Sequence, residues 1–382
     1  AVLLAHPMLA DENDAAIATW TKRTESLRSE LTGADEQAVV DVAIASIYAR
    51  LGNAEKAMPI VRRLAKSESE VAYSELWQLA IVVSEHLGGD AGNELLTLVE
   101  DPEKRGKIAW YVFAGFGACG DFPAAKRCQA LIEDDDARFE AWIGFAATST
   151  NREIAQAALH EAKPNSQKQR ERLERMPDML DAREVRKAKQ PPAAKDVWAK
   201  AAASNDAASW RTAGAAYREE GDTEKARAAL NKALAHVDAI DIESIRIGVI
   251  TLIAHEFVEM NDLPEAARVM KIAVRQLEEQ ARDAEQGEGG AADELERLLS
   301  GLVVSPVFIS TLARSGELDE AIRWATPVRQ FAALGVGCAS PQMQAELARR
   351  LSEIESPCDR ALACAGVAQG CLERRLAKVK AP

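Results

Sequence analysis

The sequence predicts an all-α fold, an α-solenoid of stacked antiparallel helix hairpins in which several repeats are degenerate. One observation is a turn residue followed by an acid or amide, which recurs along the 382 residues. A second is an alanine that follows each turn residue at the same spacing. A third is composition: 47% of the residues are hydrophobic but only 5% are aromatic, which favours alanine-rich helix packing over a β-sandwich or barrel.

The clearest hairpin spans residues 205–236. Its marker residues are Trp210, Gly214 and Tyr217 on the first predicted helix, Gly221 and Asp222 at the turn, and Ala226 and Ala233 on the second helix. Small residues on one helix leave room for large ones on the other, so the two helices can approach closely. Gly221 can adopt the left-handed conformation that ends a helix, and Asp222 can cap the next one. This stretch resembles a tetratricopeptide repeat (TPR), and the resemblance implies further hairpins stacked on either side.

Four further turns share the pattern, and in three of them an aromatic residue precedes the turn. They are Gly52-Asn53 with Tyr48 and Ala57, Gly120-Asp121 with Phe116 and Ala125, Asn261-Asp262 with Phe257 and Ala266, and Gly316-Glu317 with Leu312 and Ala321. The first two lie two periods of about 34 residues apart, so a degenerate unit with its turn at Gly88-Gly89-Asp90 is expected between them. Trp77, Trp110 and Trp142 recur at a similar interval, which places them on successive first helices. Thr150-Asn151 and Ala155 close another unit.

The pattern lapses twice, and the first lapse sets the predicted domain organisation. TPR-like repeats are expected over 1–165 and 201–382, joined by a charged, proline-containing connector over 166–200. We interpret that basic connector as a solvated charged helix followed by a stiff linker, although it could also dock an acidic partner or the other half of the chain. The second lapse, the acidic and glycine-rich stretch 283–293, predicts an exposed loop.

Charge and hydropathy exclude some classes of partner. The net charge of −13 weighs against nucleic acid, because nonspecific binding to phosphates needs clustered lysine and arginine. No apolar stretch approaches the roughly 18 residues of a membrane span. These properties suggest a soluble, cytoplasmic chain. Residues 1–10 are interpreted as part of a helix of an upstream unit, with a secretory-signal remnant and hence an exported or periplasmic protein as the alternative.

The sequence provides no sign of catalysis, so no catalytic, cofactor-binding or metal-binding residue is assigned. The six cysteines form no Cys-x-x-Cys pair, and Cys364 and Cys371 are expected as small buried thiols on one helical face. His255 and Glu256 begin a segment similar to a metalloprotease helix, but its second histidine is replaced by Glu259.

The resemblance to TPR proteins also implies where a partner would bind. In that family the first helices line a groove, and the corresponding positions here are Arg50, Trp110, Arg211, Arg218, Thr251, His255 and Glu259. A carboxylate clamp of the chaperone-docking type is not expected, because the corresponding positions of the best repeat are Arg211 and Ala215. The alternative for the two arginines of that repeat is pairing with Glu219 or neighbouring acids.

The leading functional hypothesis is therefore a noncatalytic scaffold or adaptor that binds a protein or peptide in a TPR-like groove. Two alternatives remain open. One is an exported or envelope assembly adaptor, and the other is an enzyme or sensor with an unrecognised site between the two halves. The oligomeric state does not follow from the sequence.

Overall fold

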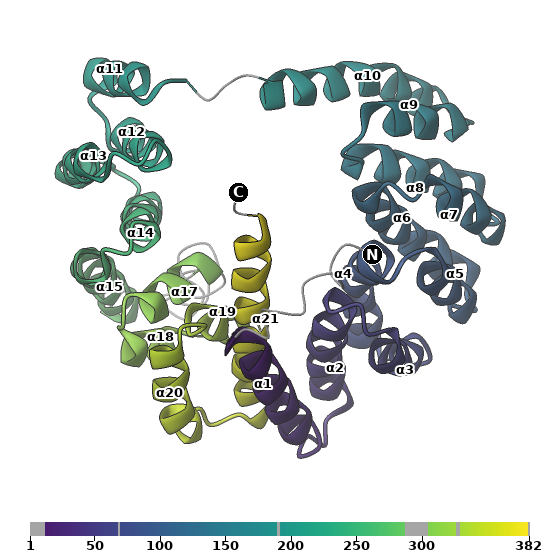
Figure 1. The fold of residues 1–382 in the computed structure, drawn as a ribbon, viewed down its shortest axis with the longest axis horizontal. Coiled ribbons are helices and arrows are strands. Elements are labelled where there is room, and N and C mark those ends of the chain that lie inside the picture. The colour runs from purple at the N-terminus through teal and green to yellow at the C-terminus, as the bar shows by residue number, and fades with distance from the viewer. Residues whose placement is uncertain (1–11, 68, 189–191, 287–304, 326–328, 381–382) are drawn as a thin grey trace. The chain divides into compact units, whose positions relative to one another are not determined.

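The computed structural model describes residues 12–67, 69–188, 192–286, 305–325 and 329–380. In these residues the structure is helical and contains no β-strand, which confirms the all-α prediction. Contacts divide the chain into two compact units (Figure 1). The N-terminal unit comprises Glu25–Lys189, and the C-terminal unit comprises 190–382 together with the residues before Glu25.

The N-terminal unit is a series of hairpins in two rows of helices (Figure 1). In the first row, α2, α4, α6 and α8 each pack on the next, and in the second row α3, α5 and α7 do the same. The helices, after an α1 that spans Glu12–Arg28, are α2 (Ala34–Arg50), α3 (Ala54–Ala65), α4 (Glu70–Leu87), α5 (Gly89–Leu98), α6 (Pro102–Cys119), α7 (Phe122–Cys128), α8 (Asp135–Thr148), α9 (Arg152–Glu161) and α10 (Gln167–Ala188).

The C-terminal unit repeats the arrangement. Its first helices α12, α14, α17, α19 and α21 pack in serial order, and α13, α15 and α18 complete hairpins with them. The helices are α11 (Ala194–Ser204), α12 (Ala207–Glu219), α13 (Thr223–Ala235), α14 (Glu243–Glu259), α15 (Leu263–Gln286), α17 (Pro306–Arg314), α18 (Leu318–Trp324), α19 (Arg329–Gly337), α20 (Pro341–Arg350) and α21 (Pro357–Lys380). This serial packing is the predicted solenoid architecture.

The predicted turns have the predicted geometry. Positive φ angles between 59° and 92° occur at all six turn residues, Gly52, Gly88, Gly120, Gly221, Asn261 and Gly316. In five of these turns, the amide after the turn residue donates back to the carbonyl five residues earlier: Asn53 to Tyr48, Asp121 to Phe116, Asp222 to Tyr217, Asp262 to Phe257, and Glu317 to Leu312, at 2.9–3.0 Å. This is the hydrogen bond of a Schellman helix end. The alanine that follows each of these five turns is fully buried.

Close packing in the clearest hairpin has the predicted steric origin. Trp210 is 2% exposed and lies edge-on to Trp198 with ring centroids 4.9 Å apart. Gly214 faces Leu230 of the second helix, where an added Cβ would lie 2.6 Å from Leu230 Cδ2. The absence of a side chain at Gly214 therefore sets how closely α12 and α13 approach.

The segment 166–200, interpreted as a charged helix followed by a linker, contains α10 and the start of α11 at Ala194. Helix α10 contacts α9, and its Arg172 pairs with Glu140 of α8. Residues 12–24 group with the C-terminal unit, where Trp20 Nε1 donates to Gln344 at 2.9 Å and Asp14 pairs with Arg375. The expected loop 283–293 is helical as far as Gln286. Its remainder and residues 1–10 lie outside the described part of the chain.

We predict that Gly214→Ala destabilises the protein, although alanine is normally favoured over glycine in a helix. The new methyl group would collide with Leu230, an overpacking cost of about 1–3 kcal/mol. Gly248 of α14 is the matched control, because a Cβ there has no neighbour within 4 Å and Gly248→Ala should stabilise by about 0.5–1 kcal/mol. Urea unfolding followed by circular dichroism measures both changes. A Gly214→Ala variant as stable as the natural protein would contradict the steric explanation.

Candidate partner-binding surface

A network of charged side chains joins three first helices of the C-terminal unit. At its centre is Glu256 of α14, which is 7% exposed. Arg218 of α12 donates from Nε to Glu256 Oε2 at 2.9 Å, and Arg211 Nη1 donates to Oε1 at 3.3 Å. A buried carboxylate is tolerated when it is paired and hydrogen-bonded in this way. The two arginines thus link the clearest hairpin to the next repeat.

The network continues to α17 through Glu259, which lies three residues after Glu256 on α14. Arg314 Nη1 donates to Glu259 Oε1 at 2.7 Å, and His255 Nε2 lies 3.8 Å from the same oxygen. Burial works to raise the pKa of Glu259, but the hydrogen bond and charge of Arg314, with the charge of Arg218, hold that pKa below its ordinary value. Burial lowers the pKa of His255, and the charge of Arg314 contributes in the same direction. Glu259 is therefore ionised at neutral pH, and His255 is neutral.

A cavity of 450 Å³ adjoins this network inside the C-terminal unit. Glu259 and Arg314 form part of its wall, so they are shared between the network and the cavity. The rest of the wall combines small residues with polar ones, namely Val258, Asn261, Leu263, Val336, Gly337, Ala339, Ser340, Gly370, Glu373, Arg374 and Ala377. A guanidinium and a carboxylate at the edge of a small-residue recess can orient a polar peptide group.

The structure brings together four of the seven residues that the resemblance nominates. Arg211, Arg218, His255 and Glu259 belong to the network. Thr251 does not line a surface: it is 3% exposed and its hydroxyl donates to the Ile247 carbonyl, because the rotation of α14 turns this position towards neighbouring helices.

The other two nominated residues belong to the N-terminal unit and lie on different helices. Arg50 ends α2, and Trp110 lies on α6, with α4 packed between these helices. Trp110 is partly exposed and lies over Gly144 of α8, where an added Cβ would lie 2.9 Å from Trp110 Nε1. These two residues therefore do not form one local cluster.

Two important members of the network, Glu256 and Arg314, were missed by sequence reasoning. The alternative of acid pairing is observed, since Arg218 contacts Glu219 at 3.7 Å, but its shorter contact is to Glu256 in the next repeat. The only signal for Glu256 was its place between His255 and Phe257, one position from a predicted groove residue. Its burial between two arginines depends on how one hairpin stacks on the next.

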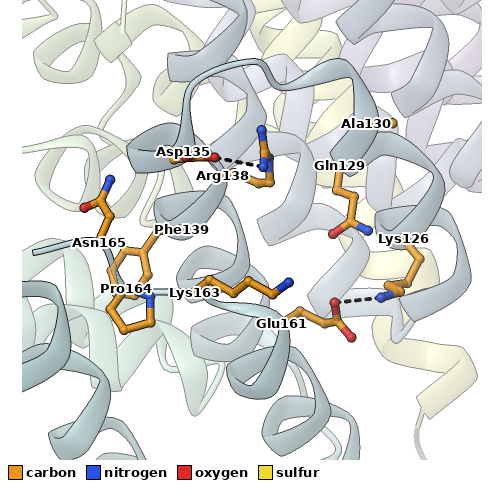
Figure 2. Close-up of a pocket in the computed structure, with 10 residues that line it drawn as sticks. All are labelled: Lys126, Gln129, Ala130, Asp135, Arg138, Phe139, Glu161, Lys163, Pro164 and Asn165. Carbon is orange, nitrogen blue, oxygen red and sulfur yellow. Dashed lines mark ion pairs between the residues drawn. The ribbon is translucent and has the colours of Figure 1, made fainter.

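The N-terminal unit holds a separate polar cavity of 610 Å³ (Figure 2). It lies among α7, the start of α8 and the segment after α9. Figure 2 shows Lys126 paired with Glu161 at 2.6 Å and Arg138 paired with Asp135 at 2.9 Å. The lining contains three cations, Lys126, Arg138 and Lys163, and two carboxylates, Asp135 and Glu161, so one positive charge is in excess.

Five of the six cysteines are buried in helix packing, as expected for Cys364 and Cys371, which are fully buried. All six are free thiols, and only Cys119 is exposed. Burial raises the pKa of Cys338 and of Cys364 to about 12, which keeps these thiols protonated at neutral pH. Within the described residues, no group of three His, Cys, Asp or Glu side chains is arranged to hold a metal ion. No helix in these residues has the length and hydropathy needed to cross a membrane.

The fold thus defines the chain as a helical-hairpin repeat protein. Residues 207–235, which form α12 and α13, match the tetratricopeptide repeat family. This match supports the resemblance found from Trp210, Gly214 and Tyr217. No match is found among curated proteins.

We predict that Arg218 and Glu256 are energetically coupled. Arg218→Ala would leave a buried carboxylate with a weaker donor set, so a double-mutant cycle with Glu256→Gln should give a coupling energy of about 1–2 kcal/mol. The control is the exposed pair Arg62 and Glu94, whose coupling should be smaller because both groups are solvated. Urea unfolding measures the four variants of each cycle. Equal coupling in the two cycles would show that burial of Glu256 has no energetic effect.

Acidification should destabilise the C-terminal unit through His255. The pKa of His255 in the folded protein lies below 6.5, so the unfolded chain binds more protons between these two values. The contribution of His255 to stability is therefore complete above about pH 6.5 and is lost as pH falls through the folded pKa. NMR titration of the His255 ring, assigned by its absence in His255→Gln, measures that pKa. A midpoint above 6.5 would contradict the assigned effect of burial.

Proposed function

We propose that this protein is a noncatalytic scaffold that binds a protein or peptide partner along the first helices of its repeats. The observation that carries the proposal is the match of residues 207–235 to the tetratricopeptide repeat, because such repeats commonly bind protein partners. Serial hairpins throughout both units support it, since they present consecutive first helices side by side.

The charged network suggests how a partner would be held in the C-terminal unit. The side chains of His255, Glu259 and Arg314 are 35–37% exposed, so each keeps a solvent-accessible part, and those of Glu259 and Arg314 line the 450 Å³ cavity. Arg314 donates to Glu259 from one nitrogen, Nη1. The other N–H groups of its guanidinium can donate to a carboxylate or carbonyl of a partner. The position of α14 against α12 is fixed by less exposed ion pairs, those of Glu256 with Arg211 and Arg218.

Capture of partners by tagged full-length protein, followed by cross-linking and mass spectrometry, tests the proposal. A partner bound by the natural protein should be reduced about tenfold by Arg314→Ala, equivalent to roughly 1.4 kcal/mol of binding energy. Arg268→Ala is the matched control, because Arg268 lies on the second helix α15 and pairs only with Glu265 of its own helix among the contacts of the described residues. Circular dichroism verifies that both variants remain folded.

The test compares how much partner each variant captures. Capture that falls with Arg314→Ala and is unchanged by Arg268→Ala supports binding along the first helices. Equal capture by all three proteins, or loss only with Arg268→Ala, would contradict it, as would the absence of any protein enriched over the tag alone.

A further inference from the structure

Four aromatic side chains form a continuous strip across two first helices of the N-terminal unit. Tyr73 and Trp77 of α4 meet edge-on with ring centroids 5.4 Å apart, and Trp77 stacks on Tyr111 of α6 at 5.6 Å with an interplanar angle of 24°. Trp110 then lies edge-on to Tyr111 at 4.9 Å. We refer to Tyr73, Trp77, Tyr111 and Trp110 as the aromatic strip. All four side chains are partly exposed.

The strip is distinct from the aromatic core of the same unit. Phe113, Phe116, Trp142 and Phe145 are fully buried and pack on one another between α6 and α8. The core therefore already supplies the aromatic packing that holds these helices together. The rings of the strip are partly exposed, and Lys104 Nζ lies 4.7 Å from the centroid of the Tyr73 ring, which shows that a cation can pack on this surface.

A carboxylate-lined cavity of 650 Å³ continues the strip along α6 and α8. Its charged lining residues are Glu103, Glu133, Asp134, Glu140 and Lys107. Lys107 lies about one turn before Trp110 on α6, and Glu140 lies one turn before Gly144, the residue that Trp110 covers. The lining thus has four carboxylates and one ammonium group, and three of the carboxylates pair with cations of the chain: Glu103 with Lys107, Glu133 with Arg105 and Glu140 with Arg172.

The pairs that Glu103 and Glu140 already make are exposed and exchangeable. Glu103 pairs with Lys107 at 2.7 Å, and both side chains are more than half exposed. Glu140 is contacted by Arg172 of α10, whose Nη1 lies 2.6 and 2.7 Å from the two carboxylate oxygens. Exposed pairs of this kind contribute little to stability, so a partner cation can replace them. The Arg172 contact also demonstrates that a guanidinium fits Glu140.

One chemical group satisfies both features of this face. A guanidinium is planar and stacks on aromatic rings, and it pairs with carboxylates through a fork of N–H groups. A lysine ammonium satisfies the charge but lacks the planar fork, and a proline ring satisfies only the aromatic surface. We propose that the aromatic strip and the adjoining carboxylates bind arginine side chains of an extended partner segment. This inference rests on the proposed function in taking the occupant to be a protein segment.

Peptide titration tests the proposal on the full-length protein. The probe is a capped, fluorescein-labelled peptide, Gly-Ser-Arg-Gly-Arg-Ser-Gly, compared by fluorescence anisotropy with peptides carrying lysine or citrulline in place of arginine. The arginine peptide should bind at least about threefold more tightly than the lysine peptide, the ratio expected from stacking of a guanidinium on an exposed ring. The neutral citrulline peptide should bind more weakly still.

Protein variants locate the site. Trp110→Ala and Glu140→Gln should each weaken arginine-peptide binding at least about threefold, whereas Trp110→Phe, which keeps a ring over Gly144, should retain most of it. Glu94→Gln is the control, because it removes an exposed carboxylate of α5 that lies outside the strip and cavity. Arg172→Ala should strengthen binding, since it releases Glu140 from its internal partner. That gain cannot come from a loss of folding.

Equal affinity for arginine and lysine peptides, or an unchanged affinity in Trp110→Ala, would overturn the proposal. So would binding that is lost with Arg314→Ala of the C-terminal unit but not with the N-terminal variants. If partner capture depends on Arg314 but the arginine peptide does not bind, this inference fails while the proposed function stands. If the peptide binds as expected but no capture depends on Arg314, the C-terminal site fails and the N-terminal one stands.

Discussion

The chain reversal between paired helices is the constraint on which the rest of this structure depends. A positive φ at one residue, such as Gly221, turns the next amide back onto the helix, where Asp222 N–H bonds to the Tyr217 carbonyl at 2.9 Å. The same amide-to-carbonyl bond recurs in five hairpins, so their helices leave the turn in a similar direction. An alanine buried after each turn then lets the second helix lie close to the first. Consecutive first helices can therefore pack in one row and carry the candidate sites.

Contacts between successive hairpins are set by a second steric condition, which is more variable. Gly335 of α19 and Gly366 of α21 face each other's helix so closely that a Cβ on either would meet a backbone carbonyl, of Ala363 and Ala332 respectively. Between α6 and α8 the close contact is instead Gly117 against the Phe145 carbonyl. Different pairs of small residues thus produce different stackings of similar hairpins. This variation explains why the repeats look degenerate while the turns remain recognisable.

The difference between these two conditions also explains how far the sequence could be interpreted. Turns depend on residues within six positions of one another, so Gly52, Asn261 and the other predicted turn residues could be identified from local spacing. The place of Glu256 could not be found in this way, because its partners Arg211 and Arg218 lie in the preceding hairpin and reach it only after the two hairpins stack. Thr251 shows the same limit, since the family position pointed to a groove while the packing of α14 buries it. The pairing of Trp20 with Gln344 joins residues 324 positions apart, beyond any local pattern.

The first-helix faces of the two units differ in chemistry in a way that follows from how their charges are paired. In the C-terminal unit, Glu256 and Glu259 meet Arg211, Arg218 and Arg314, so carboxylates and guanidiniums are nearly balanced and serve first to hold α12, α14 and α17 in place. A partner there must bind the exposed parts of side chains that are already paired, such as Glu259 and Arg314. In the N-terminal unit, the buried acid Asp41 is likewise held by Arg28 and Arg63, but the carboxylates near Trp110 make exposed pairs, Glu103 with Lys107 and Glu140 with Arg172. A cationic, planar group can replace an internal cation of such an exposed pair beside partly exposed aromatic rings, whereas the buried Glu256 keeps its two arginines. The two units can therefore select different features of a partner while using the same hairpin architecture.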